Sequence, residues 1–402
     1  MDLHIAYAFD NRVPSPQADT EQLVSTVAAL SRRGLDVTLV IPRLGEDPGA
    51  GKGAGKDAAA DEIRRFYGVE GAFAVARYPC PRGPRPLQKL VAPLRAVRAG
   101  AAREADLIHT RNLPIALAGI GAGRRVVLET YRPWPDQFAV LRPLIRRLMG
   151  HGDFVGAILH SRLARESYAR LGVPEERLLV AHNGWEPSRM EPVLERGEAR
   201  ERLELPRERP IVVYTGRVDD EKGLDVVLEV ASLAPEVLFV LVGAKEPDAF
   251  TERARRADNV RLVPWQPFEA VSRWLYAADV LLLPPSARPL ERHGSTVLPM
   301  KLFSYLAAGR PILAPRTPDV TEVLRDGENA RLVPPGDAEA AAAAVGEILE
   351  DGALRERLAD GGRRAAEGLT WDARAERIHR FLARRLEAME ATAPPTPPPA
   401  PR

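Results

Sequence analysis

Residues 211–231, IVVYTGRVDDEKGLDVVLEVA, carry Arg217 and Lys222 on one short loop between an apolar run and a predicted helix. Gly216 permits the sharp turn that such a junction needs, and parallel α/β sheets bind ligands at the carboxyl edge of their strands. Arginine offers a planar fork of donors and lysine a compact charge, so the pair suits a diphosphate. Local chemistry leaves a second interpretation open, a solvated loop whose cations pair with its own acids, Asp219, Asp220 and Glu221.

Residues 278–315 form a second segment, in the order strand, polar and proline-rich loop, helix and strand. We expect the helix to begin at about Leu298 and to stop at Gly309. Its first N–H groups would face the same sheet edge as Arg217 and would favour an anion. Taken alone, an ordinary strand–helix–strand crossover is the better explanation. Glu291 and His293 lie in the loop before this helix, either as substrate contacts or as ordinary polar loop residues.

These residues depend on a framework of strands and helices that fills both halves of the chain. Short apolar runs rich in β-branched residues alternate with longer amphipathic stretches, and the runs lack the alternation of half-exposed strands. Such runs are typical of parallel strands covered on both faces. The sequence therefore predicts the α/β class, with two Rossmann-like parallel-sheet domains facing a cleft. The expected divisions are residues 1–188, residues 189–370, a helix over 371–390 with a return to the first domain as one option, and a disordered proline-rich tail over 391–402.

The second half resembles the donor domain of glycosyltransferase family four, the GT-B enzymes that transfer sugars from nucleotide diphosphates. The matching motifs follow the family's order through roughly residues 210–380: GRVDDEKG, AADVLLLPPS, PMKLFSYLAAGRPILAP, DGENARLVPPGD and TWDARAERI. The first half is similar to the family over residues 14–42 and 158–186. The resemblance implies an acceptor-side first domain, a donor nucleotide-sugar second domain, and a retaining glycosyltransferase of cell-envelope glycan, glycolipid or polysaccharide synthesis.

The resemblance also assigns the donor-binding residues. Within the family, the Gly-Arg and Lys-Gly positions bind the donor diphosphate, and they correspond to Gly216, Arg217 and Lys222. Thr296 and Ser304 stand where the family often carries two glutamates, of which the second usually holds the ribose hydroxyls. We therefore expect Thr296 and Ser304 near the nucleotide, with Ser304 offering a single, uncharged hydrogen bond.

Further candidates follow from the same resemblance. Trp265 follows the run VRLVP near the usual position of the base, where it either stacks on the base or packs against protein. Tyr131 stands where the family commonly has a histidine. The catalytic residues are not assigned, and Tyr131, Glu291 and His293 are the candidates. The resemblance implies a metal-independent reaction with no cofactor beyond the sugar donor, and no cluster of residues has metal-ligand spacing.

Two other functions stay open beside sugar transfer. A non-catalytic GT-B binding or partner protein is favoured by the residues that depart from the family pattern, Thr296, Ser304 and Tyr131. A GT-B nucleotide-sugar epimerase would share the fold and the diphosphate site but would need acid and base carboxylates. Fold alone does not decide between them.

Composition restricts the partners. The 402 residues carry 57 basic and 55 acidic side chains, and a net charge of +2 excludes a strong overall field for nucleic acid. The single cysteine, Cys80, and the lack of an apolar run of about 18 residues fit a cytoplasmic protein. Basic and apolar residues alternate over 82–103 and 132–147. These stretches predict a lipid-linked acceptor or a peripheral contact with the anionic inner face of a membrane, with solvated arginines over a buried apolar face as the alternative.

Overall fold

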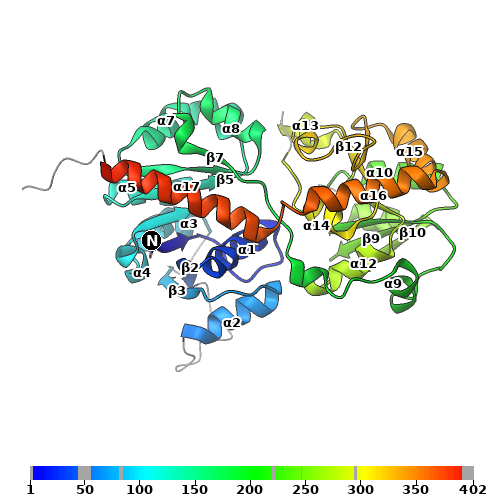
Figure 1. Cartoon of the computed structure of the whole chain (residues 1–402), viewed down its shortest axis with the longest axis horizontal. Coiled ribbons are helices and arrows are strands. Elements are labelled where there is room, and N and C mark those ends of the chain that lie inside the picture. Colours follow the sequence, from blue (N-terminus) through cyan, green and yellow to red (C-terminus); the bar gives the residue numbers. More distant parts are fainter. Residues whose placement is uncertain are drawn as a thin grey trace, which may run out of the picture.

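The computed structural model describes residues 3–43, 56–80, 85–219, 222–245, 247–293 and 297–391. Within them the strands form two sheets, one in each half of the chain (Figure 1). The first sheet holds β1 (His4–Ala8), β2 (Asp36–Arg43), β3 (Ala74–Pro79), β4 (Leu107–Thr110), β5 (Val126–Thr130), β6 (Phe154–Leu159) and β7 (Leu178–Val180). The second sheet holds β8 (Ile211–Val218), β9 (Leu238–Ala244), β10 (Val260–Pro264), β11 (Val280–Leu282), β12 (Ile312–Pro315) and β13 (Arg331–Val333).

Both sheets are doubly wound. The strand orders are β3-β2-β1-β4-β5-β6-β7 and β10-β9-β8-β11-β12-β13, and the strand pairs of both sheets run parallel. In each sheet the winding reverses beside its first strand, β1 or β8. Ligands of α/β folds bind at the carboxyl ends of strands at such a reversal. The predicted α/β class with two Rossmann-like parallel sheets is confirmed.

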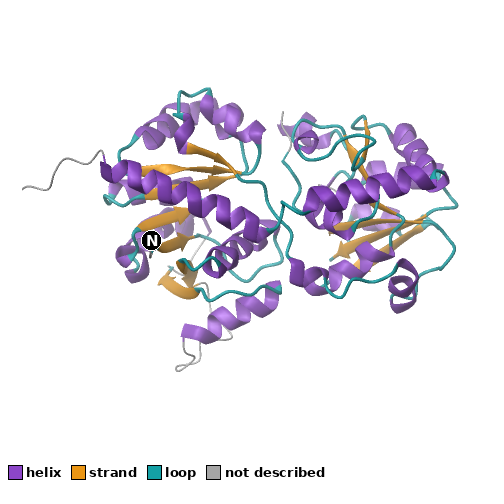
Figure 2. Ribbon diagram, viewed as in Figure 1, coloured by secondary structure: helices purple, strands orange, loops and turns teal. Residues whose placement is uncertain are grey.

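Helices cover both faces of each sheet, as Figure 2 shows. The first half has α1 (Ala18–Arg32), α2 (Lys56–Tyr67), α3 (Arg85–Arg98), α4 (Gly100–Glu104), α5 (Leu113–Gly121), α6 (Trp134–Gln137), α7 (Arg142–Gly150) and α8 (Arg162–Ala169). The second half has α9 (Arg196–Arg202), α10 (Asp225–Leu233), α11 (Ala249–Ala254), α12 (Val271–Ala277), α13 (Arg288–His293), α14 (Lys301–Ala308), α15 (Ala338–Glu350) and α16 (Gly352–Ala366). The chain ends in α17 (Trp371–Ala391). Short 3-10 helices lie at η1 (Ala139–Leu141), η2 (Glu175–Arg177), η3 (Pro187–Met190), η5 (Phe268–Ala270) and η6 (Val320–Glu322).

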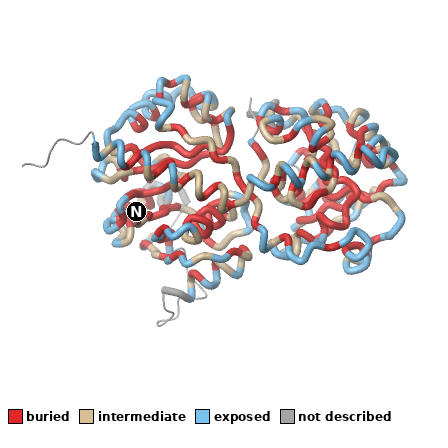
Figure 3. The backbone as a smooth tube through the Cα atoms, in the orientation of Figure 1, coloured by how far each residue is buried: buried red, intermediate tan, exposed pale blue. Residues whose placement is uncertain are grey.

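The strands form the buried centre of each half (Figure 3). Every residue of β5 and β6 is buried, as expected for parallel strands covered on both faces. On the first sheet, α1 and α17 pack on one face, and α3, α5, α7 and α8 pack on the other. The second sheet lies between α12 with α14 on one side and α10 with α15 on the other. The apolar runs of the sequence thus become the two double-faced cores.

The helix α17 follows the second sheet in sequence but packs against the first. It contacts α1 and β6, and four of its apolar residues join the core of the first half: Ile378, Phe381, Leu382 and Leu386. The chain returns beside its own outgoing segment, where Trp185 and Thr370 form a parallel bridge. A Cβ built on Gly184 would lie 2.5 Å from the carbonyl carbon of Thr370, so glycine permits this close crossing.

Two predicted boundaries differ from the structure. The helix expected from about Leu298 begins at Lys301, and the loop before it contains the separate helix α13. Pro299 lies ahead of α14, and the N–H of Leu302 donates to its carbonyl oxygen at 3.2 Å. The tail predicted over 391–402 lies outside the described residues except for Ala391, which ends α17. In the described part of the chain, no helix has the length and apolar character needed to cross a membrane.

Candidate functional site

The loop with the two predicted diphosphate-binding cations begins inside a strand rather than after it. Strand β8 continues through Arg217 to Val218, with a shift in its pairing to β9 between Thr215 and Val218. The hydroxyl of Tyr214 donates to the carbonyl oxygen of Arg217 at 2.8 Å, which holds the irregular turn. The sequence predicts Arg217 on a loop after the strand, and a bulge of this kind inside the strand has no clear signature in the sequence.

Gly216 is required here by backbone conformation and by space. Its φ is +129°, and a Cβ at this position would lie 2.5 Å from Nζ of Lys301. Gly243 on β9 also has a positive φ, +120°, and its Cβ would lie 2.1 Å from the carbonyl oxygen of Gly216. Two glycines therefore let two strands and the side chain of Lys301 approach one another at the carboxyl end of β8.

The predicted cations lie on this turn, and their side chains are exposed. Nε of Arg217 is 2.5 Å from Oδ2 of Asp219, and the N–H of Lys222 donates to the carbonyl oxygen of Asp219 at 3.3 Å. Gly223 has a φ of +68°, and its Cβ would lie 2.3 Å from Cβ of Ser286. The pairing of Arg217 with Asp219 agrees with the alternative in which the cations of the loop pair with its own acids. The same pairing orients the guanidinium group. Asp220 and Glu221 lie outside the described residues.

Lys301 joins this turn, and sequence reasoning missed it. Its Nζ lies 3.6 Å from the centroid of the buried Tyr214 ring. Burial, together with the charge of Lys222, lowers the pKa of Lys301 well below its usual value, although Asp219 acts in the opposite sense. A signal was available in the sequence, since a lysine in the first turn of a helix opposes the helix dipole. Cations from two segments therefore gather where a diphosphate site was predicted.

The residues predicted to bind the nucleotide do not lie together at one place in the structure. Ser304 is half-buried in α14, and the neighbouring Tyr305 anchors that helix to β8 by accepting a hydrogen bond from the N–H of Thr215 at 2.8 Å. The ring of Trp265 lies 6.1 Å from that of Phe66 on α2. Trp265 thus takes part in an aromatic cluster between the two halves. Thr296 lies outside the described residues.

The candidates Glu291 and His293 lie on α13, which begins two residues after Ser286, the residue that Gly223 faces. Glu291 is exposed. His293 ends the helix, and its side chain lies outside the described atoms.

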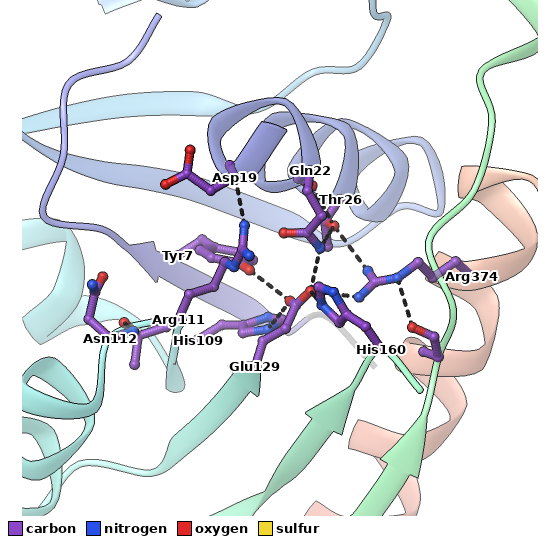
Figure 4. Close-up of polar contacts among 12 residues, drawn as sticks. Tyr7, Asp19, Gln22, Thr26, His109, Arg111, Asn112, Glu129, His160 and Arg374 are labelled. Carbon is purple, nitrogen blue, oxygen red and sulfur yellow. Dashed lines mark hydrogen bonds and ion pairs between the residues drawn. The ribbon is translucent and has the colours of Figure 1, made fainter. Parts of the chain in front are cut away.

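A buried polar network lies at the carboxyl edge of the first sheet, and Figure 4 shows that its residues converge on the carboxylate of Glu129. The network joins residues of β1, α1, β4, β5 and α17 and the residue that follows β6. They are Tyr7, Gln22, His109, Glu129, Arg374 and His160. Oε1 of Glu129 lies 2.8 Å from Nε2 of His160 and 2.6 Å from Nη2 of Arg374, and it also accepts a hydrogen bond from Gln22. Oε2 accepts the hydroxyl of Tyr7 at 2.7 Å and lies 2.9 Å from Nε2 of His109.

The network holds one negative charge inside the protein. Burial by itself would raise the pKa of Glu129, but the charge of Arg374 and the two histidines beside the carboxylate hold it well below its usual range. Burial lowers the pKa of His160 to about 4 and also lowers that of His109, so both rings are neutral near pH 7. Because an ionised carboxylate only accepts hydrogen bonds, the proton of His160 lies on Nε2.

Tyr131 borders this network. Its ring centroid is 6.2 Å from that of His160, and the guanidinium carbon of Arg111 lies 5.6 Å from the Tyr131 ring. Arg111 also donates to the carbonyl oxygen of Asp19 at 2.5 Å, as Figure 4 shows. The predicted catalytic candidate Tyr131 is therefore grouped with an arginine and a neutral histidine that sequence reasoning did not single out.

The two halves are also joined by a carboxylate at the start of a helix. Glu322 in the second half accepts the N–H groups of Arg162 and Leu163 at the start of α8, at 2.7 and 2.8 Å. Its Oε2 lies 3.0 Å from Nε2 of His182. In the described part of the chain, no group of three or more His, Cys, Asp and Glu side chains is arranged to hold a metal ion.

Comparisons with known proteins match both halves of the chain. Residues 20–184 match the family model described as glycosyl transferase 4-like domain, and residues 209–351 match that described as glycosyl transferases group 1. The lipopolysaccharide core biosynthesis glycosyltransferase LpsE of Rhizobium meliloti is 32% identical over 173 residues, which are 42% of this chain and 48% of that protein. The chain spans about half the length of the curated relatives it matches.

Solved structures match the chain over nearly its full length. Sucrose-phosphate synthase from Thermosynechococcus elongatus has a TM-score of 0.74 at 21% identity, covering 96% of this chain and 99% of that one. Anabaena Alr3699/HepE, solved in complex with UDP and glucose, has a TM-score of 0.70 at 17% identity, covering 95% of this chain and 100% of that one. At these identities the likeness shows the fold.

Proposed function

The chain belongs to the GT-B glycosyltransferases of family four, and we propose that it transfers a sugar from a nucleotide diphosphate to an acceptor with retention of the anomeric configuration. The observation that carries the proposal is the placement of Arg217 and Lys222 on the turn at Gly216, at the carboxyl end of β8. A ligand with two linked phosphates matches two cations on one turn better than a singly charged ligand does.

The chemistry of sugar transfer gives these cations a task. By analogy with glycoside hydrolysis, the sugar passes through an oxocarbenium-like state while the bond to the diphosphate breaks. Negative charge then grows on the leaving diphosphate, and cations already in place stabilise that charge without reorganising. Asp219 orients Arg217. In this proposal, Arg217 and Lys222 take the role that a metal ion has in other transferases.

Known relatives support a donor and a setting of this kind. LpsE is described as a glycosyltransferase of lipopolysaccharide core synthesis, and the similar fold of HepE was solved with UDP and glucose. We propose a cell-envelope glycan, glycolipid or polysaccharide as the product class. The test is a screen of UDP, GDP and ADP sugars for release of the nucleoside diphosphate, with the anomeric form of the sugar product followed by NMR and EDTA added to half of the samples.

The same screen separates the alternative functions. A non-catalytic partner protein is favoured by Ser304 in α14, where the family often has glutamate, and by the packing of Trp265 against Phe66. Such a protein would bind a nucleotide sugar without turnover. An epimerase would return an altered nucleotide sugar instead of a free diphosphate.

We further propose that one face of the first half contacts an anionic membrane. Large apolar side chains are exposed on α3 and around α7: Leu94 (51%), Phe138 (43%), Val140 (84%) and Leu144 (38%). The exposed arginines beside them are Arg95, Arg98, Arg146 and Arg147. Helices α3 and α7 both contact α5 on the same face of the sheet. Apolar groups beside basic groups match an anionic headgroup layer.

Part of the apolar pattern over residues 82–103 and 132–147 is buried in the protein and is therefore not available to a membrane. Val97 and Ile145, two apolar residues of these stretches, point into the core of the first half and are buried. Part of the apolar pattern thus belongs to the fold, as the alternative interpretation held. The proposed membrane contact rests on the exposed apolar side chains and their basic neighbours.

A further inference from the structure

Lys301 places an amine directly against the backbone of the proposed diphosphate site. Its Nζ lies 3.6 Å from the centre of the Tyr214 ring. A Cβ built on Gly216 would lie 2.5 Å from the same nitrogen and 3.3 Å from the Tyr214 hydroxyl. The amine therefore occupies the space beside the turn that the missing side chain of Gly216 leaves open.

The described residues around the amine compensate its charge only in part. Among the described residues, no carboxylate forms an ion pair with Lys301. The charged neighbours that act on it are Lys222, which repels it, and Asp219, which is already paired with Arg217. A contact with an aromatic face offsets only part of the cost of taking an ammonium out of water. An apolar side chain of similar length would serve a purely structural purpose better.

We propose that Lys301 binds the diphosphate of the donor, in addition to Arg217 and Lys222; this inference rests on the proposed function. A phosphate oxygen near Gly216 would give the amine the anionic partner that the described residues do not provide. Lysine carries a compact charge with three donors, which suits a phosphate oxygen bound at the turn beside which the amine lies. The anchoring of α14 to β8 through Tyr305 and Thr215 holds the start of the helix in place for this contact.

Binding of this kind is coupled to a proton. Burial and Lys222 lower the pKa of Lys301 in the free protein, and Tyr214 and Asp219 are the other groups that face the amine. A bound diphosphate favours the ammonium and raises that pKa. Above the pKa of the free protein, binding therefore takes up a proton, and the affinity falls as pH rises toward the pKa of the complex.

The test compares the wild type with Lys301→Met by isothermal titration with UDP, GDP and ADP and with the matching nucleosides. Titrations at about pH 8, where an unperturbed lysine is fully charged, are repeated in two buffers of different ionisation enthalpy to count protons. We expect the variant to bind the diphosphate about 10- to 100-fold more weakly, to bind the nucleoside unchanged, and to take up fewer protons. Its melting temperature should not fall. Lys89→Met is the control, since it removes one exposed lysine charge from the first half.

Each outcome decides the inference. Equal diphosphate affinity and equal proton uptake in wild type and variant overturn it. A variant that melts at a lower temperature and loses nucleoside and diphosphate affinity together also overturns it, because that result assigns Lys301 a structural role. A second variant, Lys301→Gln, repeats the titrations with an uncharged polar side chain in place of the apolar methionine. A folded wild type that binds none of the three diphosphates overturns the proposed function itself. That result differs from the failure of the Lys301 contact alone, in which the wild type still binds.

Discussion

Nη2 of Arg374, on the last helix of the chain, lies 2.6 Å from Oε1 of Glu129 at the carboxyl end of β5. The two residues stand 245 positions apart in sequence, and both are buried. Arg374 also donates to the hydroxyl of Thr26 on α1 at 3.0 Å. The helix that follows the second sheet in sequence therefore supplies the charge that balances the buried carboxylate of the first half.

Removing Arg374 should be strongly destabilising. The substitution Arg374→Met leaves the Glu129 carboxylate buried without its cation, and breaking a buried pair in this way costs about 3–5 kcal/mol. Urea unfolding of the variant measures the loss. Arg380→Met, on the exposed side of the same helix, is the control and should change stability by less than about 1 kcal/mol. Equal effects of the two substitutions would contradict this account of the network.

The contact of Glu322 with α8 should depend on pH. Burial by itself would raise the pKa of Glu322, but hydrogen bonds from His182 and from the N–H groups of Arg162 and Leu163 lower it below its usual value. The stabilisation is therefore complete above the pKa of an unfolded glutamate, about 4.3, and is lost as pH falls through the lower pKa of the folded state.

The measurement is the difference in unfolding free energy between wild type and Glu322→Gln. We expect about 1–3 kcal/mol near neutral pH, because charged acceptors are lost, and a smaller difference below about pH 4. Glu328→Gln is the control, since that side chain is 65% exposed. A difference that grows on acidification would show that the sign of the linkage is wrong.

Gly216→Ala should damage both stability and diphosphate binding. A φ of +129° is strained for alanine, and the new Cβ would displace the amine of Lys301. We expect a loss of about 1–3 kcal/mol in unfolding free energy, together with weaker binding of nucleoside diphosphates. Gly121→Ala is the control, because no atom lies within 4 Å of its Cβ position. Unchanged diphosphate affinity in Gly216→Ala would separate this turn from the donor site.

Membrane contact makes a separate prediction. At low salt the protein should sediment with anionic vesicles and not with neutral ones, because each engaged basic residue contributes about 1 kcal/mol near an anionic surface. Val140→Ser with Leu144→Ser should reduce this binding. Val193→Ser changes a valine between η3 and α9 that is 68% exposed, and it should leave vesicle binding unchanged. Equal binding to both kinds of vesicle, or binding to neither, would contradict the proposal.

The sequence predicted the framework of the protein better than its interior polar contacts. Buried parallel strands are continuous apolar runs, so both sheets and the turn at Gly216 could be found from local pattern. Glu129 could not, because it follows the apolar residues VVL like any polar residue near a strand end, and its partners come from distant segments. The first-turn position of Lys301 could be seen in the sequence, but its significance comes from the neighbouring strand, where Gly216 leaves room for its amine.

The most direct test of the central claim is the binding of nucleoside diphosphates to the turn after β8. Wild type and the double variant Arg217→Ala, Lys222→Ala are titrated with UDP, GDP and ADP and with the corresponding nucleosides, and folding is checked by circular dichroism. The account predicts that wild type binds at least one diphosphate, and that the double variant loses about 100-fold or more in diphosphate affinity while nucleoside affinity stays within about twofold. A folded double variant that binds the diphosphate as well as wild type does would contradict the account.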